Sequence, residues 1–210
     1  MKNKNFYWLI QGDCLKVLDK LNVKIDLVLT SPPFKDEDVP LPYYDWFDNV
    51  LNRLKKTCNL LLIFNSSKRL VEICKRYTPR RVLIWDKKVG MGAYRYEPIF
   101  IFCDDDERLD GYGRIWNDCI AIEPIYGFKQ LAPYQNPVKL YKQLLRYFPD
   151  KQVILDPFIG SGTTMEACQD LGRSCIGIEI NPKYCEIIKK RCFGKQFLDR
   201  EVEYKFEVIE

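Results

Sequence analysis

Short apolar runs alternate along this chain with longer segments in which apolar residues recur every three or four positions. The short runs have the length of strands, and most are apolar at consecutive positions, as in strands covered on both faces of a sheet. We expect strands at residues 6–10, 25–30, 60–64, 82–85, 99–103, 153–155 and 175–180. We expect helices at residues 14–21, 43–56, 67–76, 137–147, 163–171 and 182–192. The alternation predicts an α/β fold with a Rossmann-like, doubly wound and mostly parallel sheet.

Three segments break this alternation. Residues 85–97 carry no helical pattern, so the strands on either side are expected to form an antiparallel pair joined by a mobile, glycine-containing loop. Residues 104–136 are irregular, and we expect a short insertion there within a single domain spanning residues 1–210. Residues 201–210 alternate charged and apolar side chains, which predicts an edge strand.

The composition is that of a globular protein, with 210 residues, 47% of them hydrophobic and 30% charged. No apolar run approaches the ~18 residues of a membrane span. The first residues lack the cleavage site of a secretory signal, so no membrane contact and a cytoplasmic location are expected. The net charge of +4 is compatible with a polyanionic partner without requiring one, and the oligomeric state is left open.

The chain has no histidine, which excludes Ser-His-Asp and Cys-His catalysis. Nine cysteines are present, an odd number with no Cys-x-x-Cys pair. Without histidine or paired cysteines we expect no metal site, and most of the thiols are expected to be buried.

A glycine turn follows the strand at residues 153–155. The turn contains Gly160 and Gly162, which allow close approach of a ligand, and a helix beginning at Thr163 directs free amide groups at it. Glu179 ends the next strand about 20 positions later, the distance at which such folds place a carboxylate on ribose hydroxyls. The order of strand, turn, helix, strand and acid predicts an adenosine-containing ligand. The turn has two glycines where the dinucleotide fingerprint has three, so a dinucleotide-dependent oxidoreductase is disfavoured.

The strand at residues 25–30 ends in Thr30-Ser31-Pro32-Pro33-Phe34. The two prolines remove two backbone donors and leave carbonyl oxygens as acceptors. The Ser31 hydroxyl and the Pro32 carbonyl are suited to accept the two hydrogens of an exocyclic NH₂, and Phe34 offers a ring on which a planar base stacks. The alternative is an ordinary turn after a strand.

The two motifs together resemble the amino methyltransferases, the S-adenosylmethionine-dependent enzymes that methylate exocyclic amines of nucleic-acid bases. Residues 156–164 resemble the cofactor loop of that family, and Thr30 to Phe34 resemble its catalytic tetrapeptide with the flanking threonine. The catalytic motif precedes the cofactor loop, as in the beta group, so the resemblance implies a circularly permuted class I methyltransferase. Residues 85–87 and 96–98 resemble the paired strands near the base pocket.

The resemblance also implies the roles of individual residues. Ser31, Pro32, Pro33 and Phe34 would be catalytic. The S-adenosylmethionine site would comprise Asp13, Cys14, Thr30, Asp156, Pro157, Phe158, Gly160, Gly162, Thr163, Glu179 and Ile180. Asp13 corresponds to the acid that contacts adenine. No covalent intermediate is implied, because Cys14 follows that acid and is not in a Pro-Cys context.

Two departures from the family leave the substrate open. Residues 132–137 replace a stretch that often reads His-Pro before Lys-Pro, and residues 104–136 are barely long enough for a target-recognition region. Ser31 stands where other members carry Asp or Asn and resembles the cytosine-N4 enzymes, and the family as a whole favours DNA. Structured RNA, adenine N6 and a non-catalytic binding module are the alternatives. Lys87, Lys88 and Arg95 are candidates for phosphate contacts, or are simply solvated. Lys189, Lys190 and Arg191 are expected on the exposed face of a helix.

Overall fold

A computed structural model describes residues 4–34, 39, 42–88, 95–103, 109 and 117–209. Within these residues nine strands form one sheet in the order β6-β4-β5-β3-β2-β7-β8-β1-β9. The strands are β1 (Lys4–Gln11), β2 (Leu27–Thr30), β3 (Leu60–Phe64), β4 (Arg81–Asp86), β5 (Tyr96–Cys103), β6 (Cys119–Ala121), β7 (Val153–Asp156), β8 (Ser174–Glu179) and β9 (Glu201–Val208). Only β5 runs against its neighbours, β3 and β4. The α/β, mostly parallel sheet with an antiparallel pair is therefore confirmed.

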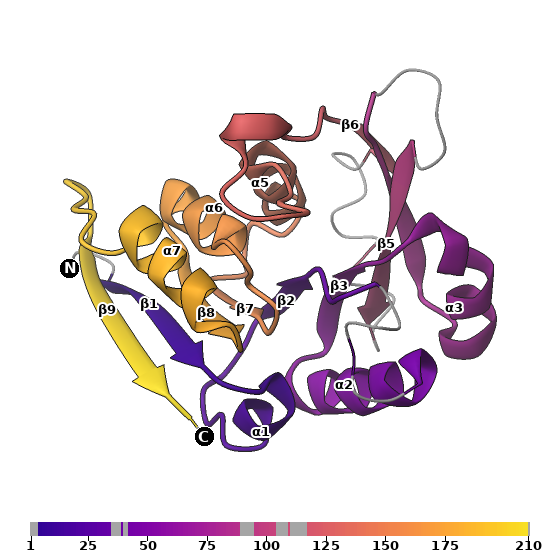
Figure 1. Ribbon diagram of the computed structural model, residues 1–210, viewed down its shortest axis with the longest axis horizontal. Helices are drawn as coiled ribbons and strands as arrows, with labels where there is room; N and C mark the ends of the chain where they lie inside the picture. The colour runs from indigo at the N-terminus through magenta and orange to yellow at the C-terminus, as the bar shows by residue number, and fades with distance from the viewer. Residues whose placement is uncertain are drawn as a thin grey trace.

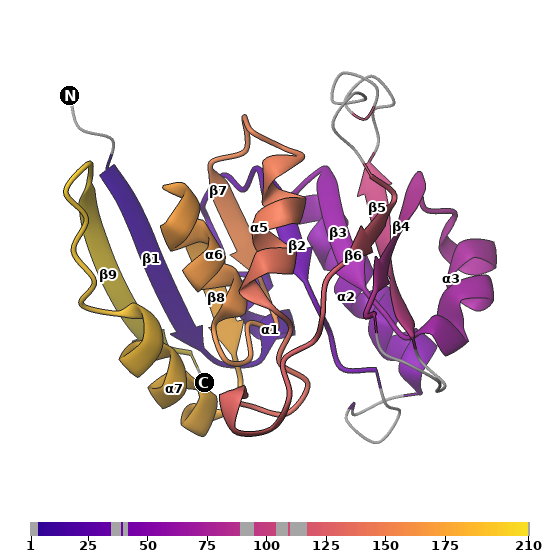
Figure 2. The ribbon, with the colours of Figure 1, turned by 90° about the horizontal axis from the view of Figure 1, so that it is seen from above.

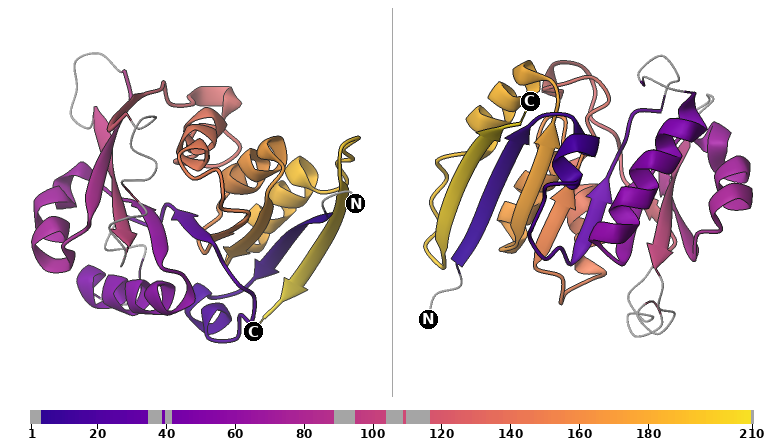
Figure 3. Two further views of the ribbon diagram at one scale, coloured as in Figure 1. Left: turned by 180° about the vertical axis from the view of Figure 1, so that it is seen from behind. Right: turned by 90° about the horizontal axis from the view of Figure 1, so that it is seen from below.

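Helices cover both faces of the sheet. They are α1 (Cys14–Leu18), α2 (Tyr43–Thr57), α3 (Leu70–Tyr77), α5 (Val138–Arg146), α6 (Thr163–Leu171) and α7 (Pro182–Cys192), with short 3₁₀ turns at Ser67–Arg69 and Gly127–Lys129. Helices α5, α6 and α7 lie on one face (Figures 1 and 2). Helices α1, α2 and α3 lie on the other face (Figure 3). No helix in the described ranges has the length and apolar character needed to span a membrane.

The helix boundaries follow local chemistry. The Asn181 side chain accepts a hydrogen bond from the Lys183 amide and Pro182 opens α7, as their cap and N1 preferences predict. Gly172 ends α6 with a φ of 67°. Two predictions were too long: α1 ends at Leu18, and the helix expected at residues 67–76 begins with a separate 3₁₀ turn.

The buried strands carry the continuous apolar pattern. All residues of β2, β3 and β8 are buried, whereas β9 at the sheet edge alternates exposed and half-buried positions. β9 pairs with β1 in parallel along its whole length, and the two run side by side in Figure 1. The predicted edge strand is confirmed.

The irregular segment before α5 contains a strand that the sequence pattern missed. β6 has only three residues and pairs in parallel with β4 at the sheet edge. Three residues are too few to display an apolar period, which is why no strand was predicted there. Residues 89–94 of the expected mobile loop, and residues 104–108 and 110–116 of the expected insertion, lie outside the described residues.

Candidate active site

Four neighbouring parallel strands bring the two motifs together at their carboxyl ends. β2, β7, β8 and β1 are consecutive in the sheet and parallel to one another. Their carboxyl ends therefore lie side by side, where ligands bind in open α/β sheets. Thr30, Asp156, Glu179 and the Gly12-Asp13 turn stand at these ends. The proline motif and the glycine turn therefore adjoin.

Asp156 joins the proline motif to the glycine turn. Its Oδ1 accepts hydrogen bonds from Thr30 Oγ1 at 2.6 Å and from the Phe158 amide at 3.1 Å. Its Oδ2 accepts a short hydrogen bond from Thr164 Oγ1. The carboxyl group is only 2% exposed, and burial raises its pKa to about 6 despite these donors. Asp156 was predicted to contact the cofactor, but both of its carboxylate oxygens accept hydrogen bonds from groups within the protein.

The two glycines of the turn are required for different reasons. Gly160 and Gly162 have φ angles of 55° and 88°, the left-handed region that glycine favours. A Cβ on Gly160 would find nothing closer than the Phe158 carbonyl oxygen at 4.0 Å, so open space faces it. A Cβ on Gly162 would lie 3.2 Å from the side chain of Ile188 in α7. Of the two glycines, only Gly160 faces open space through which a ligand could approach. At Gly162 a side chain is excluded because α7 packs against it.

Glu179 closes the turn from the neighbouring strand. Its Oε2 accepts from the Gly160 amide at 2.9 Å, and its Oε1 accepts from the Asn181 amide at 2.8 Å. Burial raises the pKa of this carboxyl group to about 7. Ile180, the next residue, is 68% exposed. A fixed, buried carboxylate with a raised pKa is suited to accept further hydroxyl donors, as a ribose provides.

Asp13 and Cys14 begin α1 beside Glu179. The Gly12 amide donates to the Glu179 carbonyl at 3.0 Å, which places the Asp13 turn next to β8. The Asp13 carboxylate caps α1 by accepting from the Leu15 amide at 2.9 Å. Cys14 is buried, and burial raises its thiol pKa to about 12. A protonated, buried thiol does not act as a nucleophile.

The proline motif follows β2 directly, and a side chain from another element holds its backbone. Pro32 is buried, while Ser31, Pro33 and Phe34 are half-buried. Arg69 donates to the Phe34 carbonyl oxygen at 3.2 Å, and its guanidinium lies 3.7 Å from the centroid of the Tyr43 ring. Asn65, fully buried at the end of β3, donates to the Tyr43 hydroxyl at 2.6 Å. Sequence patterns did not reveal this support, because Arg69 lies 35 positions from Phe34.

A wall of aromatic rings extends from β4 to α5. The Trp85 and Phe64 rings meet edge to face, with centroids 6.5 Å apart, and Phe64 stacks on Tyr141 of α5 at 5.4 Å. Burial, followed by the negative charge of Asp156, raises the pKa of Tyr141. Asn136 donates to the Tyr141 hydroxyl at 3.2 Å and accepts through its carbonyl from Thr163 Oγ1 at 3.2 Å. Asn136 therefore links these aromatic rings to Thr163 at the end of the glycine turn.

The three residues predicted to contact phosphates differ in their surroundings. Lys87 forms an ion pair with Glu97 at 2.5 Å, and its ammonium group lies 5.0 Å from the centroid of the Trp85 ring. Burial raises the pKa of Glu97, and the Lys87 charge opposes this. Lys88 and Arg95 are exposed at the ends of β4 and β5. Lys87 thus has a partner within the protein, whereas Lys88 and Arg95 face solvent.

The prediction that Arg191 lies on the exposed face of its helix is wrong. Its side chain is only 11% exposed and pairs with Glu166 of α6. Its Nη1 donates to the Ser161 carbonyl oxygen at 2.9 Å. The exposed-face expectation fails for Arg191, because α7 crosses the glycine turn there. Lys190 is exposed as expected.

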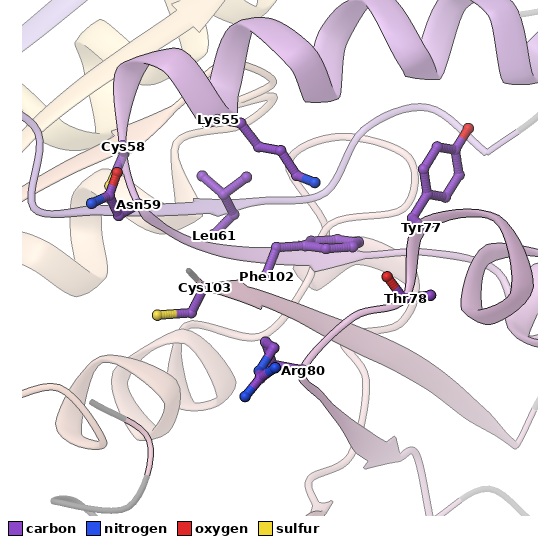
Figure 4. A pocket seen from close by; sticks show the side chains of 9 residues that line it. All are labelled: Lys55, Cys58, Asn59, Leu61, Tyr77, Thr78, Arg80, Phe102 and Cys103. Carbon is purple, nitrogen blue, oxygen red and sulfur yellow. The ribbon is translucent and has the colours of Figure 1, made fainter. Parts of the chain in front are cut away.

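A cavity of about 180 Å³ lies at the other end of the strands, where β3 begins and β5 ends (Figure 4). Lys55, Arg80 and Phe102 are among its lining residues. The Lys55 ammonium lies 5.5 Å from the centroid of the Phe102 ring. Parallel strands separate this cavity from the carboxyl ends that carry Thr30 and Asp156, so it is not part of the candidate active site.

The fold and the site define a class of protein. A mostly parallel sheet with one reversed strand, a glycine turn after β7 and an acid at the end of β8 are the features of a class I methyltransferase. The proline motif precedes the glycine turn in the chain, which makes the order circularly permuted.

Comparison with known proteins agrees with this class. A family model described as DNA methylase, of the N6 and N4 type, matches residues 104–190. The type II methyltransferase M.HpaI of Haemophilus parainfluenzae is 43% identical over 230 residues, covering 87% of this chain and 73% of M.HpaI. The DNA adenine methyltransferase YhdJ of Escherichia coli is 25% identical over 246 residues, covering 87% of this chain and 81% of YhdJ. The chain belongs to the family of N6 and N4 DNA methylases.

Solved structures share the fold. The M1.HpyAVI complex with S-adenosylmethionine aligns with a TM-score of 0.69 at 21% identity, covering 89% of this chain and 99% of that chain. The PvuII DNA methyltransferase, described as cytosine-N4-specific, also aligns with a TM-score of 0.69, at 18% identity, covering 95% of this chain and 89% of that chain.

Proposed function

We propose that this protein transfers a methyl group from S-adenosylmethionine to the exocyclic amino group of a DNA base, with cytosine N4 as the target. The observation that carries the proposal is the adjacency of Ser31-Pro32-Pro33-Phe34 and the glycine turn, linked through Thr30 and Asp156. A methyl group passes between two sites only when their occupants are within bonding reach.

The residues at the glycine turn fit an adenosine-type cofactor. Glu179 presents a buried carboxylate for the ribose hydroxyls, Gly160 leaves open space, and Ile180 offers an exposed apolar side chain beside them. When bound, S-adenosylmethionine supplies a methyl group on a sulfonium, which a neutral amine attacks directly.

The proline motif acts on the amine. The Ser31 hydroxyl and the Pro32 carbonyl accept the two amino hydrogens, which draws the nitrogen toward tetrahedral geometry and frees its lone pair from the ring. Phe34 stacks on the base, which must leave the duplex to reach this position. The transfer would break the sulfur–methyl bond, with its electron pair remaining on sulfur, and leave the nitrogen positively charged. The nitrogen would then release one proton to solvent water.

The choice of base depends on Ser31, a serine at the first position of the tetrapeptide. The cytosine-N4-specific PvuII methyltransferase has the same fold, which is compatible with this choice without selecting it. Similarity to the adenine methyltransferase YhdJ supports adenine N6 as the second candidate.

The test is a methyl-transfer assay with labelled S-adenosylmethionine on DNA and on ribosomal RNA, followed by mass spectrometry of the product nucleosides. We expect N4-methylcytosine from DNA. N6-methyladenine would replace the cytosine assignment, and methylated RNA alone would replace the DNA assignment. Cofactor binding without any methylated product would instead support a non-catalytic binding module.

A further inference from the structure

Arg191 in the last turn of α7 contacts the glycine turn from outside. Its Nη1 donates to the Ser161 carbonyl oxygen at 2.9 Å and to the Ser161 hydroxyl at 3.2 Å, with a longer contact of 3.5 Å to Thr163 Oγ1. Its Nε pairs with the Glu166 carboxylate. One guanidinium thus connects α7, the glycine turn and the first turn of α6.

Within the glycine turn the Gly162 amide donates to the Ile159 carbonyl oxygen at 2.9 Å, and Glu179 holds the Gly160 amide from the neighbouring strand at 2.9 Å. Gly160 and Gly162 give the turn two positions of high backbone freedom, with φ angles of 55° and 88°. Gly162 is also the N-cap of α6, and it has no side chain with which to cap the helix. Ser161, between the two glycines, gains a further contact from Arg191, so the conformation at the start of α6 depends in part on a side chain outside the turn.

The surroundings of Arg191 favour a rigid contact. Ser161 and Thr163 are 5% and 6% exposed, and the Arg191 side chain is 11% exposed. Hydrogen bonds from a charged donor are stronger than neutral ones, and arginine presents its donors in a fixed planar fork. The same part of α7 also packs Ile188 against Gly162.

We propose that Arg191 is a positioning residue for the cofactor turn: its guanidinium holds Ser161 and the start of α6 in the conformation that receives S-adenosylmethionine. The inference rests on the proposed function of the turn. Arg191 acts through Ser161 and Thr163, and a preorganised turn binds more tightly because less conformational entropy is lost on binding.

The experiment compares four variants. Arg191→Met removes the donors and keeps much of the aliphatic side chain, and Arg191→Lys keeps the charge without the fork. Glu166→Gln weakens the ion pair and leaves the Ser161 contacts in place. Lys190→Ala, at an exposed neighbouring position, is the control. The readouts are the calorimetric Kd for S-adenosylmethionine, the KM for DNA, kcat at saturating cofactor and the Tm of the free protein.

We expect Arg191→Met to raise the cofactor Kd by about ten- to a hundredfold, with kcat at saturation and the KM for DNA unchanged. Arg191→Lys should recover part of the affinity, and Glu166→Gln should lower the Tm with little effect on Kd. An unchanged Kd in Arg191→Met overturns the proposal. The proposal is also overturned if Arg191→Met and Glu166→Gln lower the Tm equally and raise the cofactor Kd equally. The Arg191–Ser161 contact would then contribute only to the stability of the fold.

Amide hydrogen exchange separates this inference from the proposed function. In the free protein we expect faster exchange of the amides of residues 160–164 in Arg191→Met than in Lys190→Ala. Faster exchange with no S-adenosylmethionine binding by the unaltered protein would support the role of Arg191 and refute the cofactor assignment. Equal exchange in the two variants would refute the role of Arg191.

Discussion

Thr30 Oγ1 donates a hydrogen bond to Asp156 Oδ1 across 2.6 Å, although the two residues are 126 positions apart in the chain. Thr30 immediately precedes the proline motif, and Asp156 immediately precedes the glycine turn. The bond therefore fixes the proline motif, proposed to hold the base, relative to the glycine turn, proposed to hold the methyl donor. Both partners are buried, so water does not readily replace either of them.

Thr30→Val should destabilise the protein. The substitution keeps the shape of the side chain and leaves Asp156 Oδ1 with one fewer donor in a buried site, which costs about 1–3 kcal/mol of unfolding free energy. Urea denaturation measures the loss. Thr30→Ser, which retains the hydroxyl, should remain within about 1 kcal/mol of the unaltered protein. Equal stability of the valine and serine variants would show that the bond contributes nothing.

Cofactor affinity should rise with pH. Burial raises the pKa of Glu179 from 4.5 to about 7, so the carboxyl group of the free protein is mostly protonated at pH 6. Ribose hydroxyls donate to the carboxylate, so binding favours the charged form and releases a proton. The Kd for S-adenosylhomocysteine should fall roughly tenfold between pH 6 and pH 8 and level off above.

Glu179→Gln is the control for this pH dependence, because it removes the titrating group and keeps the shape. The variant should bind more weakly at pH 8 and lose the part of the pH dependence that Glu179 contributes. An identical pH profile in the variant would assign the titration to the ligand or to another group.

Substitutions in the proline motif should affect turnover and spare cofactor binding. Ser31→Ala removes an acceptor for the amino hydrogens, and Phe34→Ala removes the stacking ring. Each should lower kcat by about 10²-fold or more, with the Kd for S-adenosylmethionine nearly unchanged. Phe34→Tyr keeps the ring and should retain most activity. Full activity in both alanine variants would refute the base-pocket assignment.

Gly162→Ala should destabilise the fold more than Gly194→Ala does. Both glycines have positive φ, 88° and 77°, so both substitutions carry backbone strain. Only the Cβ at position 162 would press on a side chain, that of Ile188 at 3.2 Å, since nothing lies within 4 Å of a Cβ at position 194. We expect an extra loss of about 1–3 kcal/mol from overpacking, measured by urea denaturation. Equal losses of unfolding free energy in the two variants would show that α7 shifts to accommodate the added methyl group.

Lys88 and Arg95 should contribute to DNA affinity through charge alone. Removing either one should weaken binding to specific and non-specific duplexes alike and should reduce the slope of log K against log salt by about 1. Fluorescence anisotropy at several salt concentrations measures both effects. Lys24→Ala, at an exposed lysine that precedes β2 at the opposite end of the strands, is the charge-matched control. An unchanged slope in both variants would show that these residues are only solvated.

The local pattern of the chain predicted the parts that depend on neighbouring residues. Apolar runs marked the buried strands because both faces of β2, β3 and β8 are covered. The glycine turn, the Asn181-Pro182 start of α7 and the Gly172 stop follow from backbone preferences that a few residues determine. The proline motif is visible in the sequence for the same reason, since it consists of five consecutive residues.

Only the tertiary structure decided which distant residues meet. The order of the strands places β2 beside β7, and this adjacency turns Thr30 and Asp156 into partners. The crossing of α7 over the turn buries Arg191 and gives Gly162 its packing role. Pairing of this kind depends on sheet order and helix packing, which join segments far apart in the chain and leave no period or spacing in the sequence around either partner.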